Sequence, residues 1–280
     1  MSTSIVSQAN ARSAAIRGHS ATAPIGVLDS GLGGLSVVKS LRLRLPFESI
    51  LYFADSAYCP YGERDESFIR DRTLAIARQL QDRGAKALVI ACNTACTVAL
   101  DQVRASVTIP VVGLEPAVKP AVARTRTGRI AVFATPRTVA SDRLARLIDR
   151  YAAGIEVERI AAPEWVDLVE QDGIRSEGAL AKITSLVRPA VDRGADVLVL
   201  GCTHFPFLTS QIQHAAGSHV AIVDSGDAIA RRTRDILDAL ELLELPRKDS
   251  APIELLTSSA RPSDLRFRAA TMLGAVVHLA

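Results

Sequence analysis

Two short segments of this chain combine a thiol with polar side chains that could move a proton. They are Cys92-Asn93-Thr94 and Cys202-Thr203-His204, and each follows a run of aliphatic residues typical of a buried strand. A thiol placed where a strand gives way to a helix is close to the helix dipole, which favours the thiolate. His204 can take up the proton of Cys202 or return it. The two segments predict a pair of acid/base groups.

The two cysteines also end two copies of one sequence pattern. Residues 83–92 recur 110 positions later as residues 193–202, with six of the ten positions identical. Ligands of open α/β sheets bind beyond the carboxyl ends of the strands. If two similar units face each other, the thiols therefore approach one ligand from opposite sides. The alternative is an old duplication that only preserves two buried cysteines.

Short apolar runs alternate with helical periodicity along the chain, which is typical of parallel sheets covered on both faces. We predict an α/β fold of two similar parallel-sheet domains related by a pseudo-twofold axis, with the active site between them. The predicted domains are residues 24–118 plus 226–280, and residues 119–225. Residues 1–23 carry basic but no acidic side chains, and we expect a disordered arm there. The predicted strands are 25–28, 50–53, 87–91, 111–114, 130–133, 197–201, 220–223 and 253–256.

Composition excludes several classes of protein. The 280 residues carry a formal net charge of +3 with both signs mixed, and only 4% are aromatic, so no basic stripe with interleaved aromatics indicates nucleic-acid binding. The longest apolar runs are far shorter than the roughly 20 residues of a membrane helix. Four cysteines without an export signal indicate reduced thiols and a cytoplasmic protein.

A glycine-rich turn, Asp29-Ser30-Gly31-Leu32-Gly33-Gly34, follows the first predicted strand. Backbone N–H groups at such a turn bind anions such as carboxylates, but the spacing matches neither common nucleotide motif. Asp29 can orient a base or cap the next helix. A zinc site built from Cys92, Cys96, Cys202 and His204 is an alternative, but these spacings are not those of common zinc modules, and we expect no metal.

Five motifs, in order along the chain, resemble those of the cofactor-independent glutamate racemases of the aspartate/glutamate racemase superfamily. They are Asp29-Ser30-Gly31-Leu32-Gly33-Gly34, Asp55 with Pro60-Tyr61-Gly62, Cys92-Asn93-Thr94, Ala134-Thr135-Pro136-Arg137-Thr138, and Gly201-Cys202-Thr203-His204-Phe205-Pro206. The resemblance runs from about residue 24 to the C-terminus.

The resemblance implies interconversion of L- and D-glutamate without pyridoxal phosphate, other cofactor or metal, supplying D-glutamate for peptidoglycan, in an enzyme that commonly dimerises. Cys92 and Cys202 match the two acid/base groups, assisted by Asp29, His204 and Glu170. The implied substrate-binding residues are Asp29, Ser30, Pro60, Tyr61, Gly62, Cys92, Asn93, Thr94, Thr135, Thr138, Cys202, Thr203 and His204.

Two departures qualify the resemblance. Many relatives have a cysteine before the proline of the Glu170 stretch, whereas here Ala162 precedes Pro163. The N-terminal arm is longer than in many relatives, and some relatives with long arms respond to a peptidoglycan precursor.

Three alternatives stay open at this point. They are an aspartate racemase with the same chemistry, a two-lobed amino-acid-binding protein, and a pyridoxal enzyme whose Schiff-base lysine would be Lys39, Lys86, Lys119, Lys182 or Lys248.

Overall fold

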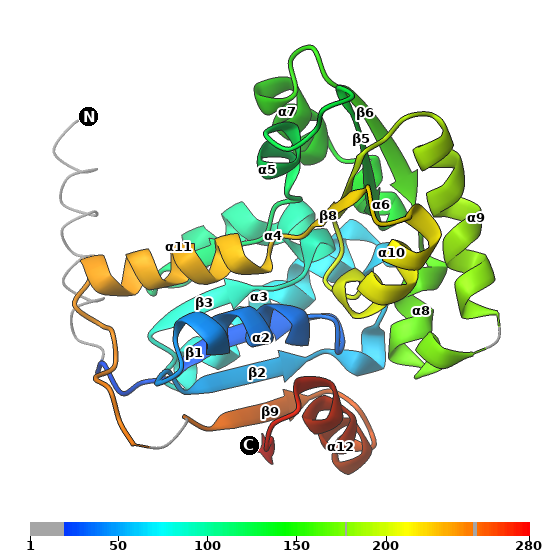
Figure 1. Ribbon diagram of the computed structural model, residues 1–280. Coiled ribbons are helices and arrows are strands. Elements are labelled where there is room, and N and C mark those ends of the chain that lie inside the picture. Colours follow the sequence, from blue (N-terminus) through cyan, green and yellow to red (C-terminus); the bar gives the residue numbers. More distant parts are fainter. Residues whose placement is uncertain (1–19, 177, 249–250) are drawn as a thin grey trace, which may run out of the picture.

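The computed structural model describes residues 20–176, 178–248 and 251–280, which form two parallel β-sheets with helices on their faces (Figure 1). The first sheet has the strand order β10-β9-β2-β1-β3-β4, and the second has the order β6-β5-β7-β8. All strand pairs in both sheets are parallel. The predicted class, two similar parallel-sheet α/β units, is confirmed.

The central strands of the first sheet are short and buried along their whole length, as expected for parallel strands covered on both faces, whereas its edge strand at residues 278–279 is exposed. The strands of the first sheet are β1 (Ile25–Asp29), β2 (Ile50–Ala54), β3 (Ala87–Ile90), β4 (Val111–Gly113), β9 (Ile253–Thr257) and β10 (His278–Leu279). Those of the second sheet are β5 (Arg129–Ala134), β6 (Glu156–Ala161), β7 (Val197–Leu200) and β8 (Ala221–Val223).

Helices cover both faces of each sheet (Figure 1). In the first sheet α2 packs with α11, and α3 packs with α4; in the second, α9 packs with α10, and α5 packs with α7. The α-helices are α2 (Leu35–Arg44), α3 (Glu66–Asp82), α4 (Asn93–Ser106), α5 (Val118–Val122), α6 (Pro136–Val139), α7 (Asp142–Tyr151), α8 (Glu164–Glu170), α9 (Ala179–Asp192), α10 (Thr209–Ala216), α11 (Gly226–Ala239) and α12 (Pro262–Leu273). The 3₁₀ helices are η1 (Ser56–Tyr58), η2 (Tyr61–Glu63), η3 (Gly173–Arg175) and η4 (Phe205–Leu208).

The internal repeat corresponds to a repeated strand order. The order β2-β1-β3-β4 in the first sheet is matched by β6-β5-β7-β8 in the second, and the repeated ten-residue pattern leads into β3 and β7. The sequence prediction missed β6, the counterpart of β2, because β6 is an edge strand with the charged residues Glu156, Glu158 and Arg159 and no apolar run. Edge strands of this kind are protected from further pairing by their charges. The two-residue strand β10 was also missed.

The chain passes from the first sheet to the second after β4 and returns after β8, so α11, β9 and α12 rejoin the first sheet (Figure 1). The exact domain boundaries stay a prediction. The predicted disordered arm, residues 1–23, lies outside the described residues except for its last four. No helix among the described residues is long and apolar enough to cross a membrane.

A buried ion pair anchors the start of the described chain to the first sheet. Lys86 is fully buried, and its Nζ lies 2.5 Å from Glu48 Oε2. The same ammonium group donates to the carbonyl oxygens of Ala21 and Leu242. The residues just before β1 and just after α11 are therefore joined at one cation.

Candidate active site

The carboxyl ends of β1 and β3 in the first sheet and of β5 and β7 in the second meet at one cavity. Its lining consists of Ser30, Pro60, Tyr61, Gly62, Cys92, Asn93, Thr94, Thr135, Val166, Cys202, Thr203 and His204. This is the edge of an α/β sheet at which ligands bind. Both predicted acid/base cysteines open into the same cavity, one from each sheet.

Cys92 stands at the start of a long helix. It is the N-cap of α4, and its Sγ accepts a hydrogen bond from Ala95 N (3.4 Å). Its thiol faces Ser30 Oγ at 3.8 Å. Burial raises the pKa of Cys92 well above the usual thiol range, and the negative charge of Asp29 raises it further, while the Ala95 N–H opposes both effects. The expected lowering by the helix end is therefore outweighed by desolvation.

Cys202 has a different support. The expected helix does not begin directly after it, because a turn and η4 lie between β7 and α10. Instead its Sγ lies 3.6 Å from His204 Nδ1, and His204 Nε2 donates to Glu170 Oε1 at 2.7 Å. Sulfur, imidazole and carboxylate thus form a line of three groups.

His204 and Glu170 each stabilise the charged form of the other. Burial lowers the pKa of His204, but hydrogen bonds to Cys202, Cys59 and Glu170 outweigh it, and the pKa lies well above its usual value. Burial raises the pKa of Glu170, but the contacts with His204 and the Leu32 N–H bring it below its usual value. We interpret the pair as an imidazolium beside a carboxylate, so that His204 Nδ1 can donate to the Cys202 sulfur.

Asp29 lies behind the cavity lining. Its Oδ1 accepts from Gly31 N (2.9 Å), and its Oδ2 accepts from Thr203 Oγ1 (3.0 Å). The carboxyl group is fully buried, and burial raises its pKa to about 6, although the His204 charge lowers it. Asp29 therefore links the end of β1 to the loop that carries Cys202 and His204.

Two glycines of the turn after β1 allow His204 and Glu170 to approach the first sheet. A Cβ added at Gly33 would lie 2.4 Å from His204 Nδ1, and one added at Gly31 would lie 2.1 Å from Glu170 Oε1 and 2.9 Å from Cys59 Sγ. Any side chain at either position would displace these groups. Leu32 N then donates to Glu170 Oε1 at 2.6 Å.

The loop after β2 brings Tyr61 and Gly62 to the cavity. The buried Asp55 holds this loop, accepting from Tyr61 Oη at 2.6 Å and forming an ion pair with Arg72. A Cβ at Gly62 would lie 3.2 Å from the Thr135 Cβ, so the loop packs tightly against the second sheet. The Asp55 motif therefore has a positioning role.

The structure brings together nearly all of the predicted substrate-binding residues. Thr138 lies behind Thr135, whose Oγ1 donates to Thr138 Oγ1 at 3.1 Å, and Thr94 Oγ1 lies 3.0 Å from Thr135 Oγ1. Among the described residues, Asn93 Oδ1 is buried without a hydrogen-bond partner. A buried acceptor of this kind is costly unless a ligand donates to it.

Two residues near the site carried no signal that the sequence prediction used. Val166 of α8 contributes an apolar side chain to the cavity. Cys59, in the loop after β2, lies beside His204 and Ser30. Cys96 is buried within α4, where its Sγ donates to Ile90 O and accepts from Leu114 N.

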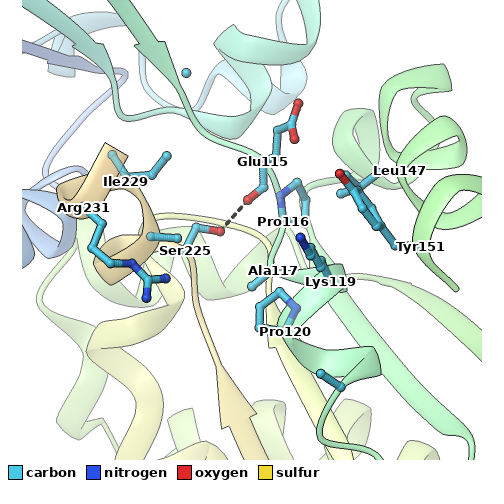
Figure 2. Close-up of a pocket in the computed structure, with 13 residues that line it drawn as sticks. Glu115, Pro116, Ala117, Lys119, Pro120, Leu147, Tyr151, Ser225, Ile229 and Arg231 are labelled. Carbon is cyan, nitrogen blue, oxygen red and sulfur yellow. Dashed lines mark hydrogen bonds between the residues drawn. The ribbon is translucent and has the colours of Figure 1, made fainter. Parts of the chain in front are cut away.

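The cavity between the thiols is almost closed, with a volume of about 10 Å³, roughly that needed for one water molecule. A larger cavity of about 460 Å³ lies where the chain crosses between the sheets (Figure 2). There Ser225 Oγ donates to Glu115 O at 2.5 Å. This hydrogen bond joins the two segments in which the chain crosses between the sheets, one after β4 and one after β8. This larger cavity has none of the thiols, so we do not assign the chemistry to it.

Comparison with known proteins agrees with the geometry. Residues 25–233 match the family described as Asp/Glu/Hydantoin racemase. The chain therefore belongs to this family of racemases, and it is an isomerase. The resemblance inferred from the five motifs is confirmed.

The similar proteins are named more specifically. The glutamate racemase of Herpetosiphon aurantiacus is 46% identical over 235 residues, covering 84% of this chain and 92% of the relative. That of Methylococcus capsulatus is 43% identical over 255 residues, covering 91% and 93%. Among solved structures, Bacillus anthracis glutamate racemase isoform RacE1 has a TM-score of 0.80 at 29% identity, covering 92% of this chain and 97% of that one. Escherichia coli glutamate racemase in complex with L-glutamate and the activator UDP-MurNAc-ala has a TM-score of 0.78 at 33% identity, covering 92% and 98%.

Proposed function

We propose that this chain interconverts L- and D-glutamate by moving the α-proton between two cysteines, without pyridoxal phosphate. The observation that carries the proposal is that Cys92 and Cys202 line one cavity from equivalent strand ends of two similar sheets. The names of the relatives and of the matching structures support glutamate as the substrate.

In this mechanism one thiolate removes the α-proton, and the opposite thiol donates its proton to the other face of the resulting carbanion. The sulfurs exchange protonation states, and reverse turnover or exchange with water restores the first state. A turnover on the order of 10 per second allows a barrier of only about 16 kcal/mol. Holding the reacting atoms about 3–3.5 Å apart and donating hydrogen bonds to the developing carbanion supply much of the required lowering.

The two thiols have different resting roles in this proposal. His204 Nδ1 lies 3.6 Å from the Cys202 sulfur and can exchange a proton with it, whereas burial and the Asp29 charge raise the pKa of Cys92 and favour its protonated form, the form that donates a proton. The resting enzyme is then prepared for the enantiomer whose α-proton faces Cys202. After one turnover the protonation is reversed, which suits the other enantiomer.

The polar lining accounts for an amino-acid substrate. Asn93 Oδ1 is placed to accept from the α-ammonium group, which would satisfy its buried oxygen. The hydroxyls of Ser30, Thr94, Thr135 and Thr203 line the cavity, and we assign the two carboxylates of the substrate to them. Asp29, Thr138 and Glu170 support these groups from behind.

Glutamate requires a larger space than the closed cavity provides. We propose that the two sheets separate about the crossings at Glu115 and Ser225 to admit it (Figure 2). We further propose that the enzyme acts in the cytoplasm as a homodimer and supplies D-glutamate for peptidoglycan.

Proton exchange tests the proposal directly. Purified enzyme is incubated with each glutamate enantiomer in heavy water, and the recovered glutamate is analysed for α-deuterium and for configuration. We expect deuterium first in the product enantiomer, because the donating thiol has exchanged with solvent. Incubation with both aspartate enantiomers tests substrate choice. Exchange without inversion, or faster turnover of aspartate, would contradict the proposal.

A further inference from the structure

A cluster of three metal-ligating side chains lies at the outer side of His204. Among the residues that the structure describes, Cys59, Glu170 and His204 each offer one ligand atom, and these atoms lie within 4.8 Å of one another. The proposed proton transfer uses His204 and Glu170 but assigns nothing to Cys59. The set differs from the zinc set considered from sequence, since it excludes Cys92, Cys96 and Cys202.

The donor set suits zinc. A thiolate, an imidazole and a carboxylate are its common ligands, with bonds of about 2.0–2.3 Å, so that ligand atoms on one ion are separated by roughly 3.5 Å. Glu170 Oε1 and His204 Nε2, which lie 2.7 Å apart, need to separate by a little under about 1 Å to admit the ion, and Cys59 Sγ, within 4.8 Å of both ligand atoms, needs to close by about 1 Å. Gly31 permits this closure, because it places no side chain between Glu170 Oε1 and Cys59 Sγ.

A second cavity gives access to this cluster. It has a volume of about 480 Å³, and its lining includes Cys59 and Glu170 together with two carboxylates and two guanidinium groups, those of Asp167, Asp264, Arg261 and Arg268. It is separate from the cavity between Cys92 and Cys202, to which Cys59 and Glu170 do not contribute lining. An ion can therefore reach Cys59 and Glu170, and His204 behind them, from this side, and water can complete a tetrahedral set.

The three ligands belong to different sheets. Cys59 lies in the loop after β2 of the first sheet, whereas Glu170 ends α8 and His204 follows β7 of the second. An ion held by all three would cross-link the sheets beside the nearly closed substrate cavity. Because glutamate needs that cavity to widen, such a link opposes substrate binding.

We propose that Cys59, Glu170 and His204 form an inhibitory zinc site that fastens the two sheets together and keeps the substrate cavity closed. Zinc replaces two protons that leave to solvent, the thiol proton of Cys59 and the Nε2 proton of the His204 imidazolium, so that a thiolate and a neutral imidazole become ligands. The ion also takes the Glu170 carboxylate from its hydrogen bond with His204. Removing zinc with a chelator restores the starting state, because no covalent bond within the protein is made or broken.

Metal binding is tested first without reference to activity. Cobalt(II), which occupies zinc sites and absorbs light, is added to the full chain, and near-ultraviolet thiolate-to-metal charge transfer is recorded. We expect the absorption in the wild type and in Cys92→Ser, Cys202→Ser and Cys96→Ser. We expect it to disappear in Cys59→Ser. Loss in Cys92→Ser or Cys202→Ser with retention in Cys59→Ser would overturn the proposal, as would no cobalt binding to the wild type.

Inhibition is then measured by titrating zinc into the racemase assay at several glutamate concentrations. We expect reversible inhibition that preincubation with glutamate reduces and that a chelator removes. Cys59→Ser is expected to weaken it at least about tenfold, since even residues outside the ligand set change metal affinity 10- to 100-fold. Cys96→Ser serves as the matched control and keeps the wild-type response.

Cys59→Ala provides a second variant in case the serine disturbs the loop, and circular dichroism checks the fold of both. Full zinc inhibition in the two folded Cys59 variants would overturn the proposal. The cobalt spectrum does not depend on which amino acid is racemised, so failure here is distinguishable from failure of the proposed function.

Discussion

The ends of β3 and β7 show how one duplicated backbone provides two different thiol environments. Cys92 caps the 14-residue helix α4 and is enclosed near the negative charge of Asp29. Cys202 has no helix directly behind it and contacts His204, which is held by Glu170. A racemase must treat two mirror-image substrates with one L-amino-acid framework, so its two bases need not be supported identically. The difference teaches that the repeated backbone fixes the position of each thiol, while local substitutions set the polar groups that surround it.

Removing either sulfur is the strongest way to break this comparison. Cys92→Ala and Cys202→Ala each remove one of two proposed acid/base groups, and a positioned group of this kind contributes about 10²–10⁴-fold to rate. We expect racemisation to fall by about 10³-fold or more in both variants. Steady-state rates from both enantiomers provide the measurement. Cys96→Ser is the control, and full activity in either alanine variant would disprove the two-base assignment.

His204→Asn affects only the Cys202 side and so sharpens the comparison. Loss of the imidazole removes the partner of the Cys202 sulfur, and we expect racemisation to fall by about 10²-fold. Isotope exchange should fall more for the enantiomer whose α-proton faces Cys202 than for the other. The exposed His214→Asn on α10 is the matched control. Equal loss of exchange for both enantiomers would show that the two thiols are not independently supported.

Glu170→Gln tests the outer end of the same line of groups. A neutral amide can still accept from His204 Nε2, but it no longer stabilises the imidazolium, so the raised pKa of His204 should fall. His204 then loses its proton at lower pH, and the alkaline side of the pH–rate profile should move to lower pH. We expect a rate loss of about tenfold near neutral pH. Asp167→Asn, one turn earlier on α8, is the control, and an unchanged pH profile in Glu170→Gln would contradict this role.

Asp29→Asn gives the smallest expected effect, and it is one on stability. Burial raises the pKa of Asp29 to about 6 in the folded protein, above the ordinary value of 3.8 for an aspartate side chain. Ionising the Asp29 carboxyl therefore costs more free energy in the folded protein than in the unfolded chain. This cost is absent at pH values below the unfolded-state pKa, and it is complete at pH values above the folded-state pKa. We expect the asparagine variant to gain about 1–3 kcal/mol over the wild type as pH rises from about 4 to 7.

Urea unfolding at a series of pH values measures this gain. Asp224→Asn, at the exposed end of β8, is the control. A stability difference that stays constant with pH would contradict the assignment. The Asp29→Asn variant should also lose racemase activity, because the neutral amide removes the carboxylate charge next to the active site.

Much of the fold could be predicted because parallel strands are buried on both faces and leave unbroken apolar runs. All eight predicted strands are present with small differences at their ends. The missed strand β6 lies at an edge, where charged residues replace that signal. Its place was nevertheless implied by the repeat, because the second unit needed a counterpart of β2.

Site residues directly after strands could be predicted because the strand end fixes their position. Cys92, Cys202 and Ser30 are of this kind. Glu170 ends a helix and Cys59 lies in a loop, so their positions depend on packing between the sheets, which local sequence does not determine. The environment of Cys202 differed from expectation for a similar reason, since the pattern gave no sign that a turn would replace the helix start.

The buried ammonium group of Lys86, directly before β3, limits how far the N-terminus of the chain can be shortened. Lys86 has acceptors at Glu48, Ala21 and Leu242, and none of these is part of the cavity. Deleting residues through Ala21 would leave a buried ammonium ion with one acceptor fewer, a loss on the order of 1–3 kcal/mol. A fusion tag or a protease cut is therefore better placed well ahead of Ala21, even though Cys92 and Cys202 lie at the opposite ends of their strands.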